Sequence, residues 1–223
     1  SAPGTGLTQA FEDRVLGPSD KKFSQDLRYY DRGTALVRRV ATDPFAIGIA
    51  SFANTGTTRM LTLTGTCGFV LRANRRAIKT EDYPLTSAMF LYLPERRLAK
   101  VARDFLAYVR GPGAQIVIRR AGFVDQAPER ISMNAQGDRL TNAILAAGPE
   151  VSLGELQRLA HTLSGFRRLS TSFRFEAGSA RPDAQSRSNI AQLARALETG
   201  LYDGKVLKFV GFSDGQGVAS GNR

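Results

Sequence analysis

Residues 209–223 read "FVGFSDGQGVASGNR", an apolar run that leads into a turn rich in glycine and serine. The apolar and β-branched composition of residues 205–212 predicts a strand that the glycines after it terminate. Asp214 follows directly, so the strand places one carboxylate at its end. A further helix is expected to begin after Gly217.

The sequence before this strand completes a strand–helix–strand order. Residues 183–199 carry apolar side chains at helical spacing, and the spacing predicts an amphipathic helix. Residues 170–182 contain a predicted strand with Phe173 and Phe175 on one face, because alternate residues of a strand point the same way.

This half of the chain, residues 169–223, resembles the OmpA-like peptidoglycan-binding domain. The resemblance rests on "TSFRFEAGSARPDAQSRSNIAQLARAL" followed by "VLKFVGFSDGQGVASGNR". The family has a strand, a Gly-Ser-Ala turn, a helix, a strand and then a short motif around an aspartate. The residues that match this motif and its continuation are Phe212, Ser213, Asp214, Gly217 and Asn222.

The resemblance implies a binding role for Asp214. In that family the matching aspartate receives the ammonium group of the diaminopimelate side chain in the cell-wall peptide, and a later arginine binds the carboxylate. The family pattern continues beyond Arg223, so the domain is expected to be truncated here. The alternative is that Asp214 only caps the next helix, and both interpretations stay open.

The first half of the chain alternates predicted helices and strands. Periodicity and turn residues predict helices over residues 5–16, 33–41, 96–110 and from 111 to about Gly122, and strands over residues 45–52, 59–64 and 88–94.

The turn at the start of this half is a candidate anion site formed by Thr5, Gly6, Leu7 and Thr8. A turn of glycine and hydroxyl residues that enters a helix presents free backbone N–H groups and the positive end of the helix dipole to an anion. A plain helix cap at Thr5 explains the same residues, so the turn alone does not establish a ligand.

Residues 1–125 also resemble the second half of the phosphate-binding proteins of ABC-type uptake systems. The segments that carry the resemblance, in order, are "VATDPFAIGIASFA", "KTEDYPLTSAMFLYLP" and "ARDFLAYVRGPGAQIVIRRAGFV". The resemblance implies that Thr5-Gly6-Leu7 stands where the family holds phosphate with a Ser-Gly-Thr turn. Leu7 lacks the second hydroxyl, which Thr8 would have to supply. The family's first lobe segment is expected to be missing.

The two resemblances together define the predicted organisation. An α/β domain, the N-terminal part of a periplasmic-binding-protein-like fold, covers residues 1–125. A linker with a helix over residues 152–164 covers residues 126–168. An α+β OmpA-like domain, with the incomplete start of a βαβ unit, covers residues 169–223.

Charge and composition limit the possible partners. The chain has 31 Lys and Arg against 20 Asp and Glu, for a net charge of +11, which favours anionic partners at low salt. A solvated basic surface is an equally good explanation. The five Arg-Arg pairs are scattered and form no continuous basic arm. Nucleic-acid binding would therefore rest on net charge and nothing else, and we do not expect it.

Few residues suit catalysis or metal binding. Cys67 is the single cysteine and His161 the single histidine, so no internal disulfide and no Cys/His metal cluster can form. No nucleophile triad, paired carboxylates or phosphate-binding loop is evident. No apolar run approaches the ~18 residues of a membrane-spanning helix. The sequence therefore predicts no enzyme, no cofactor, no metal and no transmembrane segment.

The resulting hypothesis is a non-catalytic binding and anchoring protein of the Gram-negative periplasm, associated with the cell wall or outer membrane. Peptidoglycan and phosphate, or a similar oxyanion, are its expected partners. The alternative is a cell-envelope scaffold whose solute-binding-like domain has lost its ligand and contacts partner proteins.

Overall fold

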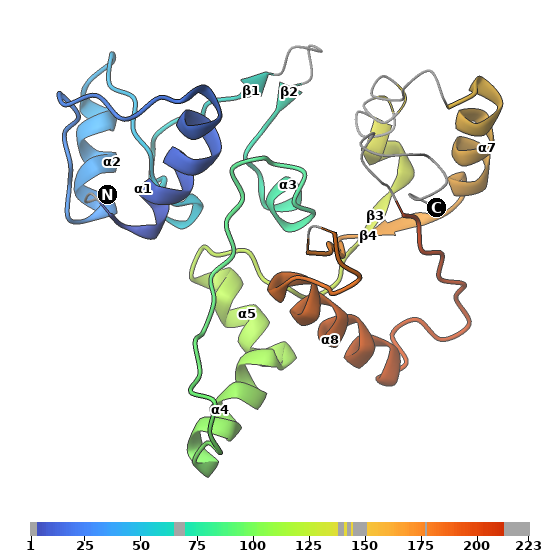
Figure 1. Ribbon diagram of the computed structural model, residues 1–223. Coiled ribbons are helices and arrows are strands. Elements are labelled where there is room, and N and C mark those ends of the chain that lie inside the picture. The colour runs from blue at the N-terminus through green and yellow to red at the C-terminus, as the bar shows by residue number, and fades with distance from the viewer. Residues whose placement is uncertain are drawn as a thin grey trace. The chain divides into compact units, whose positions relative to one another are not determined.

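The computed structural model describes residues 4–64, 70–137, 141, 144, 151–176 and 178–211. The chain divides into two compact units. The first unit comprises Ser1–Ala127 and Thr171–Asn189, and the second comprises Pro128–Ser170 and Ile190–Arg223. Helices and two small antiparallel sheets make up the described elements (Figure 1). The mixed helix and sheet content expected from the sequence is thereby confirmed, whereas the predicted domain limits stay predictions.

The first unit begins with the helical segment that the sequence predicted. Helix α1 (Gly6–Phe11) continues as a π-helical turn, η1 (Glu12–Leu16), and a 3-10 turn, η2 (Gly17–Ser19). The rings of Phe11 and Phe23 stack with their centroids 5.8 Å apart. This contact packs the chain that follows the helix back against it.

Helix α2 (Gly33–Thr42) matches the helix predicted over residues 33–41. Its buried Leu36 faces the extended chain that follows. A Cβ at Gly48 would lie 2.9 Å from Val40 Cγ2 and 3.2 Å from Leu36 Cδ1, so a larger residue there would force these side chains to shift. A 3-10 turn, η3 (Phe52–Asn54), comes next.

A short hairpin and a short helix follow. Strands β1 (Leu63–Thr64) and β2 (Val70–Leu71) pair antiparallel, with Leu63 opposite Leu71. Helix α3 (Arg75–Lys79) begins after Asn74, whose Oδ1 accepts a hydrogen bond from the Ala77 N–H at 2.9 Å. This cap explains why so short a helix has a defined start.

Helices α4 (Lys100–Arg110) and α5 (Pro112–Arg120) follow each other almost directly. The helix predicted from residue 96 begins later because Ala99 has an extended backbone, with ψ 154°. Helix α5 opens with proline at its first position, where the missing N–H costs nothing. The chain turns at Gly122, with φ +86°, as the sequence predicted.

The second unit contains the other sheet. Strands β3 (Arg130–Ser132) and β4 (Arg167–Leu169) pair antiparallel, with Ile131 opposite Arg168. A 3-10 turn, η4 (Met133–Gln136), follows β3. The linker predicted over residues 126–168 therefore contains β3 and most of β4, which its polar composition concealed. The strand predicted within residues 170–182 is wrong, since the described residues of this range form only an isolated bridge between Phe175 and Pro182.

Two strong helices complete the described elements. Helix α7 (Leu153–Leu163) begins with a capping box. Ser152 Oγ accepts from the Glu155 N–H, and the Glu155 carboxylate accepts from the Ser152 N–H. Helix α8 (Ala184–Glu198) begins in the first unit and ends in the second. The sequence predicted both helices within one or two residues.

Three further strand predictions are wrong. Residues 45–52 and 88–94, and the described part of 205–212, contain no strand. Of residues 59–64, only Leu63 and Thr64 pair. A strand exists only when a neighbouring strand satisfies its backbone groups, and these segments have no such neighbour among the described residues. Many of their apolar side chains are consequently exposed, with Phe45 93% and Tyr92 92% accessible.

The described part of the chain has few fully buried apolar residues. In the first unit they are Leu36 and Ala114, and in the second they are Ile131, Leu193, Ala196 and Tyr202. Of the helices described, none combines the length and the apolar character that crossing a bilayer requires.

Candidate functional site

The structure describes only one of the two predicted binding sites. Thr5, Gly6, Leu7 and Thr8 lie at the start of α1 in the first unit. The predicted peptidoglycan-binding residues lie outside the described residues; they are Phe212, Ser213, Asp214, Gly217 and Asn222. Cys67 also lies outside them.

The turn before α1 has the backbone of a helix cap but not its side-chain bond. Thr5 stands at the cap position with extended geometry, φ −75° and ψ 150°, and its carbonyl accepts from the Gln9 N–H at 2.9 Å. Its hydroxyl lies 2.7 Å from the hydroxyl of the buried Thr8 and makes no capping bond to the helix backbone. The predicted helix cap at Thr5 is thus confirmed for the main chain only.

Thr5 and Leu7 line a cavity of about 190 Å³. A single water molecule needs only about 10–15 Å³ of such space, so the cavity has room for a small ligand. The remaining lining residues come from the start of α2 and from the chain that follows it; they are Asp31, Gly33, Leu36, Ile49, Ala50, Ser51 and Asn54. The cavity therefore joins the predicted anion-binding turn to segments that the sequence did not connect with it.

The cavity is lined both by groups that attract an anion and by one carboxylate that repels it. Gly33 is the first residue of α2, where backbone N–H groups and the helix dipole favour negative charge. The Asn54 Nδ2 donates a hydrogen bond to Ser51 Oγ at 3.2 Å. Asp31 supplies the one carboxylate of the lining and opposes an anion. Sequence reasoning missed Asp31, Ser51 and Asn54, because no spacing links these scattered polar residues to the Thr5 turn.

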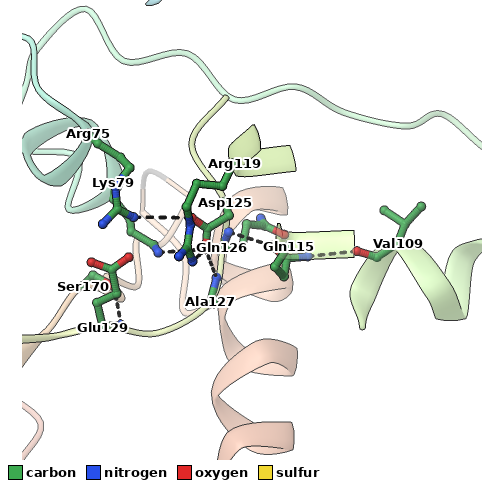
Figure 2. A network of polar contacts seen from close by, with 10 residues as sticks. All are labelled: Arg75, Lys79, Val109, Gln115, Arg119, Asp125, Gln126, Ala127, Glu129 and Ser170. Carbon is green, nitrogen blue, oxygen red and sulfur yellow. Dashed lines mark hydrogen bonds and ion pairs between the residues drawn. The ribbon is translucent and has the colours of Figure 1, made fainter. Parts of the chain in front are cut away.

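A second polar cluster in the first unit surrounds Asp125 (Figure 2). The residue is 2% exposed. Lys79 Nζ lies 2.9 Å from its Oδ1, and Arg119 Nε lies 3.0 Å from its Oδ2. Arg75 Nη1 approaches Oδ2 at 3.5 Å, and the Ala127 N–H donates to Oδ1 at 3.1 Å. One buried carboxylate thus accepts hydrogen bonds from α3, from α5 and from the backbone just after it.

The cations around Asp125 set its titration. Burial alone would raise the pKa of this carboxyl, but the hydrogen bonds from Arg119 and Lys79 outweigh burial and lower the pKa from 3.8 to about 2. At neutral pH the group is therefore an anion and too weak a base for proton transfer. The geometry is that of a structural ion cluster.

Glutamine side chains extend the network along the chain. The Gln126 N–H donates to Gln115 Oε1 at 2.8 Å, and Gln115 Nε2 donates to the Val109 carbonyl at 2.9 Å (Figure 2). Ser188 Oγ, on α8, donates to Gln126 Oε1 at 3.2 Å. These bonds join the end of α4, the start of α5 and the first half of α8.

In the second unit, a pair of hydrogen bonds between Glu129 and Ser170 lengthens the small sheet, and Figure 2 draws the contact of these two residues. The Glu129 N–H donates to Ser170 Oγ at 2.9 Å, and the Ser170 N–H donates to the Glu129 carbonyl at 2.8 Å. The pair lies directly beyond Arg130 and Leu169 in the ladder. It therefore extends the sheet by one further pair of residues.

The described ranges contain no group of three or more His, Cys, Asp and Glu side chains placed to hold a metal ion. His161 lies in the last turn of α7 and is exposed.

Comparison of the chain with protein-family models, with curated proteins and with solved structures found no match.

Proposed function

We propose that this chain is a non-catalytic binding protein of the cell envelope. In this proposal the first half binds phosphate or a similar oxyanion, and the second half attaches the protein to peptidoglycan. The observation that supports the first part is the cavity at Thr5 and Leu7, because it brings the predicted anion-binding turn next to the N-terminus of α2.

The chemistry of the cavity suits a small oxyanion in three respects. The first N–H groups of α2 can donate to anionic oxygens, as at other helix N-termini. Ser51 and Asn54 offer a hydroxyl and an amide donor, and Thr5 adds a hydroxyl that also contacts the Thr8 hydroxyl. Asp31 opposes the ligand's charge, so we expect moderate rather than tight binding.

Calorimetric titration with inorganic phosphate tests this part. Thr5→Val and Asn54→Ala should each weaken binding, because each removes a donor from the lining. Thr42→Val is the matched control, since its hydroxyl bonds to the Arg38 and Arg39 carbonyls at the other end of α2. Equal binding by all four proteins would contradict the assignment of the cavity.

The anchoring part rests on the resemblance of residues 169–223 to OmpA-like domains. Asp214, with Ser213 and its neighbours, would bind the ammonium group of the stem peptide. A carboxylate is the natural partner of an ammonium group, because their hydrogen bonds are charge-assisted. The finer fold assignment belongs to the same proposal: a periplasmic-binding-protein-like α/β domain followed by an α+β OmpA-like domain.

Sedimentation with purified peptidoglycan tests the anchoring part. Asp214→Ala should release the protein from the pellet, whereas Asp203→Ala, which removes an exposed carboxylate from the turn after α8, should not. Retention of both variants at the wild-type level would exclude Asp214 as the recognition group. The same proposal places the protein in the periplasm of a Gram-negative cell, at the wall or outer membrane.

The scaffold remains the second candidate, and a specific observation favours it. Phe45 and Tyr92 are almost fully accessible, on segments that have no partner strand among the described residues. Exposed apolar surface of this kind is typical of surfaces that contact other proteins. Absence of both heat and a thermal shift with phosphate, in a protein that still sediments with peptidoglycan, would favour the scaffold.

A further inference from the structure

The chain segments that flank the β1–β2 hairpin in the first unit line a groove of about 570 Å³. The ladder ends at the pair Leu63–Leu71, and beyond it the two arms enclose the groove. One arm contributes Arg59, Met60, Leu61 and Thr62, and the other contributes Arg72, Ala73 and Asn74. All seven residues are described (Figure 1 labels the hairpin).

Two arginines give the groove its charge. Arg59 lines one arm and Arg72 the other, and no acidic side chain lines the groove. Neither guanidinium makes a hydrogen bond or ion pair with another described residue, in contrast to Arg75, which bonds to Asp125. Two fork-shaped groups on facing arms can each bind a carboxylate in bidentate geometry.

The backbone of the first arm is also available. Met60 and Leu61 make no main-chain hydrogen bond to any described residue. Free N–H and C=O groups along an extended segment are the template for addition of a further strand. The side chains of Met60, Leu61 and Ala73 supply apolar contacts between the two charges.

Local hydrogen bonds fix the conformation of the second arm where it enters α3. The Asn74 N–H and its Nδ2 both donate to the Arg72 carbonyl, at 2.9 and 3.4 Å, and Asn74 also caps α3. A preorganised arm lowers the entropic cost of binding.

We propose that this groove binds an acidic peptide segment in extended conformation. Carboxylates of the segment pair with Arg59 and Arg72, and its backbone adds to the free edge at Met60 and Leu61. Charge complementarity selects this partner: with a net charge of +11, a second copy of the chain is repelled. The proposal is independent of phosphate binding at the Thr5 cavity.

Fluorescence anisotropy with a labelled hexapeptide of alternating glutamate and valine tests the proposal. We expect saturable binding to the full chain at low salt. The double variant Arg59→Gln, Arg72→Gln should bind about tenfold more weakly or worse, a loss of roughly 1.4 kcal/mol. The double variant Arg96→Gln, Arg97→Gln is the matched control, because it removes the same charge from another exposed segment.

Two further peptides separate strand addition from simple charge attraction. A lysine–valine hexapeptide should not bind. The glutamate–valine peptide with alternate backbone nitrogens methylated should bind much more weakly, because it cannot complete the strand pairing. Circular dichroism confirms that each variant is folded. The proposal is overturned if wild type does not bind, if both double variants lose affinity equally, or if the methylated peptide binds as well as its parent.

Discussion

Asp125 keeps its negative charge in a place that solvent barely reaches. Lys79, whose side chain is 4% exposed, lies at 2.9 Å, and Arg119 lies at 3.0 Å. A buried pair of this kind contributes little beyond what apolar residues would, but loss of one partner leaves an uncompensated charge. Among the described residues of the first unit, we therefore expect a conservative substitution of Asp125 to lower the free energy of unfolding most.

Substitution Asp125→Asn should reduce the free energy of unfolding by about 3–5 kcal/mol, because it strands the buried Lys79 ammonium. Urea denaturation followed by circular dichroism measures the loss. The matched control is Asp104→Asn, whose partner Lys100 lies at 2.7 Å but whose pair is exposed, at 82% and 61% for the two side chains. The control should change stability by less than about 0.5 kcal/mol.

The same carboxyl predicts an acid-sensitive stability. Its pKa is about 2 in the folded chain and ordinarily 3.8, so the unfolded chain binds more protons between these values. The stabilisation is complete above about pH 4 and is lost as pH falls toward about 2. Wild type should lose stability over this window faster than Asp125→Asn, by at most about 1.4 kcal/mol per pH unit. Parallel pH profiles for the two proteins would contradict the pairing.

At the scale of elements, helices here are defined by local signals and strands are not. Helix α7 illustrates the first case: a Ser152–Glu155 capping box fixes its start, and apolar periodicity fixes its length. Such signals lie within a few residues of each other, so the sequence alone can reveal them.

Loss of the Ser152 cap should therefore destabilise α7 selectively. Ser152→Ala should cost about 1 kcal/mol, because it leaves the Glu155 N–H without its acceptor. Hydrogen exchange in the peptide that spans α7 should accelerate about fivefold, the factor that corresponds to 1 kcal/mol. Ser152→Asp, which keeps an acceptor, should exchange nearly as wild type, while equal acceleration in both variants would show that the cap bond is not responsible.

The positions of the strands could not be predicted from the sequence. Residues 45–52 and 88–94 have strand-like composition, yet strand formation depends on partners far away in the chain. Asp125 was also missed as a structural centre, because it begins a polar stretch that reads as a linker. The Thr5 turn was predicted as a candidate site, but Ser51 and Asn54 join it only through tertiary folding.

At the scale of the whole molecule, exposed apolar side chains coexist with a net charge of +11. The charge keeps copies apart at low salt, while the apolar side chains favour association. Added salt should shift the balance, because it screens repulsion between charges and leaves apolar attraction in place.

Sedimentation velocity at increasing salt should therefore reveal growing self-association. Replacement of Phe45 and Tyr92 by serine should reduce it, with unfolding free energy changed by less than about 0.5 kcal/mol, because both side chains are almost fully accessible. Val101→Ser, at one exposed position on α4, controls for loss of a single apolar group. Unchanged association in the double variant would exclude these segments as the contact surface.

Lys79 and Asp125 lie 46 positions apart in the chain, and this separation has a kinetic consequence. The pair can form only after the intervening loop closes. Closure costs chain entropy before the ion pair contributes any stabilisation. We expect the pair to be absent from the folding transition state. Stopped-flow experiments should then show that Asp125→Asn accelerates unfolding while the refolding rate stays nearly constant.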